Sequence, residues 1–205
     1  MICDPDKRLT AQQVLSHPWI KKEAPNSNGT ISMKNIQSMR KFKDHNKLQK
    51  AVITFIASRL QDKEVEKLKN IFQSLDANND GTLTLEEMKD GIESLNDPKV
   101  EKEIETLFNS LDTDKSGKID YTEFLAACLD QKNYLRTERL TEAFQMLDLD
   151  GSGKISKQEL RDALKFDKVD DAVFEKYIEQ YDTNKDGEID YNEFLNLMGA
   201  LTLND

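Results

Sequence analysis

Residues 76–87 read Asp-Ala-Asn-Asn-Asp-Gly-Thr-Leu-Thr-Leu-Glu-Glu, and this arrangement of oxygen-bearing side chains around one glycine decides the fold. The arrangement recurs in residues 112–123, 148–159 and 182–193, and successive copies start 36, 36 and 34 residues apart. One copy alone would fit an ordinary Asp-Gly turn. Four complete copies at a nearly constant period instead indicate a repeated helix–loop–helix unit.

The spacing of oxygen atoms within each loop fits Ca²⁺, a hard cation that takes six to eight oxygen ligands. Positions 1, 3 and 5 supply side-chain oxygens, position 7 supplies a backbone carbonyl, and position 12 supplies a glutamate that binds through both oxygens. Position 6 is glycine in each copy because the chain turns sharply there. The predicted ligands are Asp76, Asn78, Asp80, Thr82 and Glu87; Asp112, Asp114, Ser116, Lys118 and Glu123; Asp148, Asp150, Ser152, Lys154 and Glu159; and Asp182, Asn184, Asp186, Glu188 and Glu193. We therefore expect four Ca²⁺ sites, called loops 1 to 4 in chain order.

The residue at position 8 predicts how the loops pair. It is apolar and mostly β-branched, which suits a short strand: Leu83, Ile119, Ile155 and Ile189. Loops 1 and 2 are expected to pair in one lobe and loops 3 and 4 in another, with amphipathic helices on both sides of each loop. The predicted fold class is all-α, with two such lobes, short paired strands between the loops, and a long amphipathic junction helix ahead of them.

The charge of the chain is unevenly distributed. Residues 1–61 carry 11 Lys and Arg against 4 Asp and Glu, whereas residues 62–205 carry 18 against 35. The acidic body argues against nucleic acid as a partner, and the basic arm ahead of it suggests that the two parts bind each other. No run of 18 apolar residues and no signal-peptide pattern is present. Two distant cysteines favour a reducing compartment, so we expect a cytoplasmic protein.

The basic arm contains an amphipathic helix. Residues 34–59 carry seven Lys and Arg and one acidic residue, and their apolar residues follow a helical stripe. This pattern is typical of a calmodulin target or a membrane-surface helix; a surface helix packed on another domain is the alternative. The predicted anchors of the junction helix are Phe42, Leu48, Val52, Phe55, Ile56 and Leu60. A tethered helix can also enter the groove of a second copy, so a domain-swapped dimer is a further hypothesis.

Residues 4–20 read Asp-Pro-Asp-Lys-Arg-Leu-Thr-Ala-Gln-Gln-Val-Leu-Ser-His-Pro-Trp-Ile. Thr10 and Gln13 form a capping-box pattern, and Pro18 ends the short helix. The string resembles the last helical segment of a protein kinase catalytic domain, with its Asp-Pro-x-x-Arg-x-Thr and His-Pro-Trp signature. A kinase tail, a basic helix and four EF-hand loops, in that order, resemble the calcium-dependent protein kinases of plants and protists.

This resemblance implies a C-terminal fragment with four parts. They are the tail of a kinase catalytic domain (1–22), a linker with an autoinhibitory junction helix (23–62), and two EF-hand lobes (63–133 and 134–205). The resemblance implies that the junction helix keeps a Ser/Thr kinase inactive at low calcium, until Ca²⁺ makes the lobes clasp that helix. The fragment has no glycine-rich nucleotide loop and no His-Arg-Asp or Asp-Phe-Gly motif, so we expect it to be inactive alone. ATP, Mg²⁺ and protein substrates would bind the parent kinase domain, and membrane association would come from the parent's N-terminus.

Two alternatives to kinase regulation remain at this point, a free calmodulin-like adaptor and a calcium buffer. The sequence after residue 62 contains three methionines, Met88, Met146 and Met198. Methionine makes binding grooves adaptable, so this small number favours one dedicated partner over many.

The number of acidic ligands predicts which loop fills first. With position 9 counted, loops 2 and 4 each have four carboxylates, whereas loops 1 and 3 each have three. Calorimetry on Glu123→Gln and Glu87→Gln variants tests this order within lobe 1. The first binding event should weaken more when Glu123 is lost, and an equal or smaller loss would refute the order.

Overall fold

A computed structural model of the chain describes residues 30–60, 63–93, 95–130, 136–164 and 171–199. The kinase-like stretch at residues 4–20 lies outside these ranges, so the prediction of a kinase tail at residues 1–22 stays a prediction. The domain boundaries at residues 22, 62 and 133 stay predictions too.

Two helices precede the loops: α2 (Met33–Asp44) and α3 (Lys47–Ala57). Lobe 1 consists of α4 (Lys63–Leu75), β1 (Thr82–Leu83), α5 (Leu85–Glu93), α6 (Pro98–Leu111), β2 (Ile119–Asp120) and α7 (Tyr121–Cys128). Lobe 2 consists of α9 (Thr137–Leu147), β3 (Lys154–Ser156), α10 (Lys157–Ala163), α11 (Asp171–Glu179), β4 (Glu188–Asp190) and α12 (Tyr191–Leu197). Within the described ranges, no helix is long and apolar enough to cross a membrane.

The strand pairing predicted from position 8 is confirmed. β1 pairs antiparallel with β2, where Leu83 faces Ile119, and β3 pairs antiparallel with β4, where Ile155 faces Ile189. All four side chains are fully buried, so each pair joins two loops and contributes to the core beneath them. The all-α fold with two EF-hand lobes is therefore confirmed.

An aromatic cluster connects the first and last helices of each lobe. In lobe 1 the Phe72 ring on α4 packs edge-on against Tyr121 and Phe124 on α7, with ring centroids 5.4 and 5.5 Å apart. Such edge-to-face pairs are favourable because the positive edge of one ring meets the negative face of the other. Lobe 2 repeats the arrangement with Phe144, Tyr191 and Phe194.

The junction segment differs from the expected single long helix, because it is divided into α2 and α3. His45 is extended, and Asn46 starts α3 with a capping box in which Asn46 and Gln49 each accept the other's backbone N–H. These caps satisfy N–H groups at the start of α3 that would otherwise lack partners. Lys50 of α3 lies over the Phe42 ring of α2, 5.4 Å from its centroid, so the two helices also contact each other across this corner.

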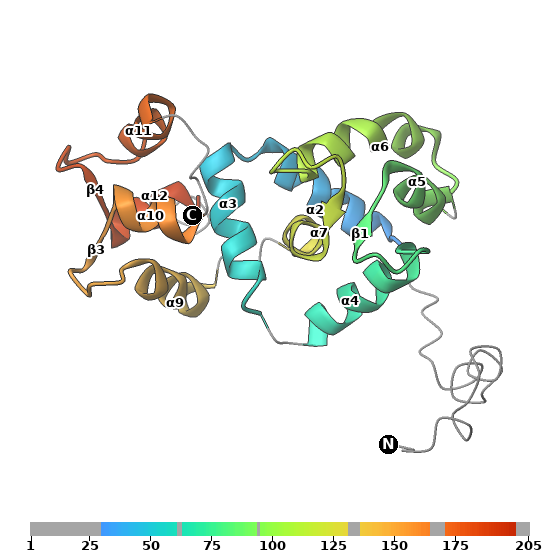
Figure 1. Cartoon of the computed structure of the whole chain (residues 1–205), viewed down its shortest axis with the longest axis horizontal. Coiled ribbons are helices and arrows are strands. Elements are labelled where there is room, and N and C mark those ends of the chain that lie inside the picture. The colour runs from blue at the N-terminus through green and yellow to red at the C-terminus, as the bar shows by residue number, and fades with distance from the viewer. Residues whose placement is uncertain (1–29, 61–62, 94, 131–135, 165–170, 200–205) are drawn as a thin grey trace, which may run out of the picture.

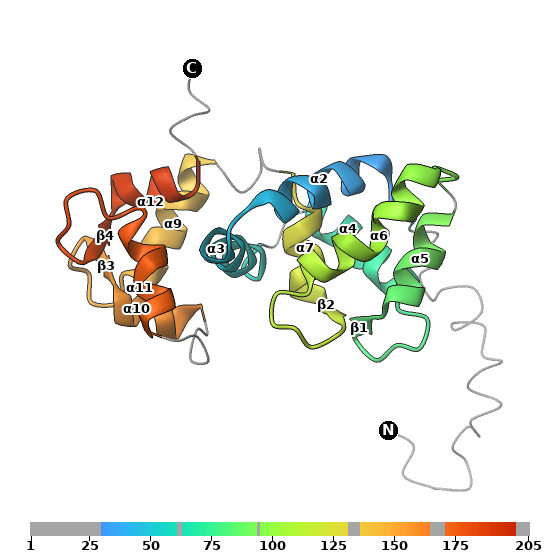
Figure 2. The ribbon, with the colours of Figure 1, turned by 90° about the horizontal axis from the view of Figure 1, so that it is seen from above.

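The two junction helices contact different parts of the molecule. α2 packs on α6 and α7 of lobe 1, and it buries Ile36, Met39 and Phe42 there. Arg40 holds α2 to α6 by donating from Nε and Nη2 to the Glu103 carboxylate at 2.9–3.2 Å. α3 lies between the lobes and contacts both α7 and α9, as the two views show (Figures 1 and 2). The junction segment is thus part of the folded core rather than a free arm.

Docking of α2 on lobe 1 predicts unequal effects for two methionines of the same helix. Met39 is fully buried, whereas Met33 is 37% exposed. Met39→Ala should lower the free energy of unfolding by about 2–4 kcal/mol, because it leaves a cavity in the core. Met33→Ala should change it by less than about 0.5 kcal/mol. Urea unfolding followed by circular dichroism measures both, and equal effects would mean that α2 does not dock.

Candidate calcium sites

The first half of each loop is wound around the aspartate at position 1. In loop 1, Asp76 Oδ1 accepts from the Asp80 N–H at 3.1 Å, and Asp76 Oδ2 accepts from the Gly81 N–H at 2.9 Å. Gly81 has φ +83°, a left-handed conformation that glycine adopts without strain. The same two bonds recur at the aspartates that open the other loops: Asp112, Asp148 and Asp182.

The side chain at position 3 shares a donor with the aspartate at position 1. Asn78 Oδ1 accepts from the Asp80 N–H at 2.7 Å, and Asp114 Oδ1 accepts from the Ser116 N–H at 3.0 Å. Loops 3 and 4 repeat this bond with Asp150 and Asn184. Because one N–H holds two side-chain oxygens, the ligands predicted at positions 1 and 3 point toward the same place in all four loops.

The glutamate at position 12 closes each loop from the other side. Glu87 Oε1 accepts from the Ala77 N–H at 3.1 Å, and Glu87 Oε2 accepts from the Thr84 N–H at 2.8 Å. Its carboxylate therefore reaches back from the outgoing helix to the start of the loop. Matching pairs of bonds hold Glu123, Glu159 and Glu193.

Hydroxyl groups that the ligand pattern did not reveal also hold these glutamates. In loops 2 and 4 the hydroxyl comes from position 2, where Thr113 and Thr183 donate to Oε1 at 2.7 and 2.8 Å. In loops 1 and 3 it comes from position 9, where Thr84 and Ser156 donate to Oε2 at 2.8 and 2.7 Å. Position 2 is not a ligand position, so only its alternation between Thr and apolar residues (Ala77, Leu149) hints at this role.

Burial and these hydrogen bonds act in opposite directions on the pKa of each glutamate. At Glu123, which is 4% exposed, burial dominates and raises the pKa, although hydrogen bonds from Thr113 and Asp120 oppose the rise. Burial also acts to raise the pKa of Glu87, Glu159 and Glu193, but hydrogen bonds outweigh it and the pKa values are lowered. Because a carboxylate must be ionised to bind Ca²⁺, loop 2 should be the most sensitive to acid.

The acidic groups converge in loops 2 and 3. Ligand oxygens of Asp112, Asp114 and Glu123 lie within 4.8 Å of one another, and so do those of Asp148, Asp150 and Glu159. Such a cluster of carboxylate oxygens suits a hard divalent cation, so these residues fit Ca²⁺.

Loops 1 and 4 differ at position 5, where the aspartate binds a lysine of the partner loop. Asp80 accepts from Lys118 Nζ at 2.8 Å, and Asp186 accepts from Lys154 Nζ at 2.6 Å. The Lys118 hydrogen bond holds the pKa of Asp80 well below its usual range, and Lys154 likewise lowers the pKa of Asp186.

Most of the backbone carbonyls predicted as ligands at position 7 lie in the paired strands. Those predicted at Thr82, Lys154 and Glu188 lie in β1, β3 and β4. The carbonyls of Lys118 and Lys154 accept from the position-5 hydroxyls of Ser116 and Ser152, at 2.9 and 3.1 Å. In loops 2 and 3 two predicted ligands therefore contact each other.

The predicted anchors of the junction segment are in the core. Phe42, Leu48, Val52, Phe55 and Ile56 are buried, and Leu60 is partly buried against the same core. Their role as calcium-dependent anchors stays a prediction.

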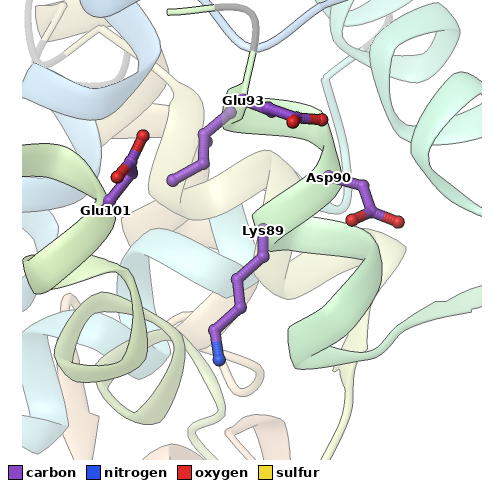
Figure 3. A pocket seen from close by; sticks show the side chains of 5 residues that line it. Lys89, Asp90, Glu93 and Glu101 are labelled. Carbon is purple, nitrogen blue, oxygen red and sulfur yellow. The ribbon is translucent and has the colours of Figure 1, made fainter. Parts of the chain in front are cut away.

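One surface pocket offers no comparable arrangement. It lies between α5 and α6 and is lined by Lys89, Asp90, Ile92, Glu93 and Glu101. Figure 3 shows that its labelled charged side chains point in different directions rather than toward a common point. The calcium loops are therefore the stronger candidate site.

The chain is similar in sequence to known proteins. The EF-hand domain pair matches residues 65–129 and 137–199 of the chain. Calcium-dependent protein kinase 1 of Oryza sativa subsp. japonica is 52% identical over 196 residues, which cover 95% of this chain and 38% of that protein. Calcium-dependent protein kinase 2 of Arabidopsis thaliana is 48% identical over 198 residues, covering 97% of this chain and 31% of that protein. The chain thus spans less than two fifths of the length of these relatives.

The hydroxyl bond to Glu123 predicts a pH-dependent effect of Thr113→Val. Without the hydroxyl, the pKa of Glu123 rises further, because burial is less well opposed. Ca²⁺ affinity at loop 2 should fall on the order of threefold at neutral pH, and further as the pH is lowered toward 5. Thr113→Ser keeps the hydroxyl and serves as the control in calcium titrations at both pH values. Equal affinities for the two variants would contradict the assigned role.

Proposed function

Since the chain belongs to the EF-hand family and corresponds to the C-terminal calmodulin-like region of calcium-dependent protein kinases, we propose that it binds four Ca²⁺ and thereby relieves autoinhibition of a Ser/Thr kinase. Two facts support four sites rather than fewer. Each loop has an oxygen-bearing side chain at positions 1, 3, 5 and 12. In each loop, backbone N–H groups hold the side chains of positions 1, 3 and 12 in the same geometry.

The proposed regulatory role is supported mainly by the contacts that the start of α3 makes with both lobes. Lys50 Nζ donates to the Ser110 carbonyl at 3.0 Å, two residues before loop 2 begins. Asn46 Nδ2 donates to the Tyr181 hydroxyl at 2.6 Å, one residue before loop 4 begins. Gln49 Nε2 adds a bond to the Leu197 carbonyl at 2.8 Å. The junction segment thus touches each lobe directly beside a calcium loop.

This position suits a calcium-driven rearrangement. In sensor EF-hands, Ca²⁺ changes the angle between the helices on either side of the loop. Ser110 lies at the end of α6, and Tyr181 lies just after α11, so these two contacts are on the incoming side of a loop, whereas Leu197 ends the outgoing helix α12. Calcium at loops 2 and 4 would therefore displace the groups that hold α3. By linkage, the contacts of α3 must in turn affect calcium affinity.

The kinase part of the proposal extends beyond this chain. A short linker joins the kinase-like residues 1–22 to α2, so a rearrangement of α2 and α3 would be passed to a kinase domain on the same chain. That domain would bind ATP, Mg²⁺ and protein substrates, and it would be the principal partner of the lobes together with the junction segment. We also propose a cytoplasmic location, with any membrane association arising from the parent's N-terminus, and a domain-swapped dimer as an alternative assembly.

Two lysines of α3 test the coupling between the junction segment and loop 2. Lys50 contacts Ser110, whereas Lys47 in the same turn is exposed. Removing either positive charge should slightly favour Ca²⁺ binding, but only Lys50→Ala also loses the contact. Relative to Lys47→Ala, Lys50→Ala should weaken Ca²⁺ binding by about threefold. In a protein that retains the kinase domain, it should raise the calcium concentration needed for half-maximal phosphorylation.

Equal behaviour of the two variants in both assays would refute the coupling. An apolar dye distinguishes the alternatives, since a buffer would show little calcium-induced apolar exposure. A free adaptor would expose its groove to other proteins whether or not the junction contacts were intact.

A further inference from the structure

In each lobe a lysine of one loop pairs with an acidic residue of the other loop. Lys118, at position 7 of loop 2, pairs with Asp80, at position 5 of loop 1, 38 residues earlier. Lys154, at position 7 of loop 3, pairs with Asp186, at position 5 of loop 4, 32 residues later. In both cases a loop with Ser at position 5 and Lys at position 7 contributes the cation, and a loop with Asp at position 5 contributes the anion.

The strand pairing brings the two loops of each lobe side by side. Antiparallel pairing sets position 7 of one loop opposite position 9 of the other, as for Thr82 and Asp120 in lobe 1 and for Lys154 and Asp190 in lobe 2. From position 7 the side chains of Lys118 and Lys154 extend across to position 5 of the partner loop. Lys154 Nζ also lies 3.7 Å from Oε2 of Glu188, which occupies position 7 of loop 4.

Each lysine thereby belongs to two sites at once. Its backbone carbonyl is a predicted Ca²⁺ ligand of its own loop, whereas its ammonium group holds a predicted ligand of the partner loop. Asp80 and Asp186 are the third carboxylates of loops 1 and 4 besides those at positions 1 and 12. In loops 2 and 3 the third carboxylate is the aspartate at position 3, whereas Asn78 and Asn184 occupy position 3 in loops 1 and 4.

We propose that Lys118 and Lys154 are built-in competitors of Ca²⁺, which lower the affinity of loops 1 and 4 and link the filling of the two loops in each lobe. The proposal rests on the calcium binding proposed above. A dication bound by Asp80 is repelled by the ammonium group already at that carboxylate. Calcium bound in loop 2 pulls on the Lys118 carbonyl. It thereby shifts the residue whose ammonium group competes with Ca²⁺ for Asp80 in loop 1.

This proposal predicts a different order of Ca²⁺ filling from the one that the number of carboxylates predicts. Both orders favour loop 2 in lobe 1. In lobe 2 the number of carboxylates favours loop 4, whereas competition by Lys154 favours loop 3. The filling order in lobe 2 therefore separates the two ideas.

Residue-resolved NMR calcium titrations of the full chain test the proposal. The amides of Gly81 and Gly117 donate to the position-1 aspartates of loops 1 and 2, so each reports on its own loop. Lys118→Gln should tighten Ca²⁺ binding at loop 1 by about fivefold at low salt, and the gain should shrink as KCl is added. Lys115→Gln removes the same charge from the same loop, but its ammonium group lies on the Asn109 carbonyl at 2.7 Å. It should leave loop 1 nearly unchanged.

Equal midpoints for Gly81 in the wild type and in Lys118→Gln, or equal shifts in Lys118→Gln and Lys115→Gln, would overturn the proposal. Failure of Gly81 to respond to Ca²⁺ in the wild type would instead refute calcium binding by loop 1. Lobe 2 provides a second test, with Lys154→Gln read at Gly187. The control there is Lys157→Gln, whose ammonium group pairs with Glu175 in the same lobe. A gain at Gly187 that appears in Lys154→Gln alone would support the proposal.

Discussion

The antiparallel contact between Leu83 and Ile119, with its counterpart between Ile155 and Ile189, is the constraint on which the other features depend. Each pair is only two or three residues long, yet it fixes two calcium loops back to back and buries its apolar side chains over the helices. The aromatic clusters around Phe72 and Phe144 then connect the helix that enters the first loop with the helix that leaves the second. A lobe is therefore one unit, and a change at either loop acts on all four of its helices.

Local spacing made much of this predictable from the sequence. The ligand positions follow from a fixed pattern within each loop, and the pairing of loops follows from one apolar residue in each. The side chains that hold the ligands were harder to predict. Thr113 and Thr183 occupy position 2, which carries no ligand, and the partners of Lys118 and Lys154 depend on how the two loops of a lobe lie beside each other.

The junction segment shows a different limit. Its predicted anchors are buried or partly buried, but the prediction of one long helix overlooked the polar break at residues 44–46. The signal of the break was local and polar, an Asn at position 46 followed three residues later by Gln49. Contacts such as Arg40 with Glu103, which are 63 residues apart, depend on how α2 docks on lobe 1 and cannot be derived from periodicity.

The corner at Asn46 has a mechanical consequence. A continuous helix transmits a displacement along its whole length, whereas two helices joined by a short extended segment can turn about that joint while each stays rigid. The main contacts of α2 are with α6 and α7 of lobe 1, whereas α3 contacts both α7 of lobe 1 and α9 of lobe 2. Movement of lobe 2 relative to lobe 1 would therefore bend the junction at this corner, while α2 keeps its position on lobe 1.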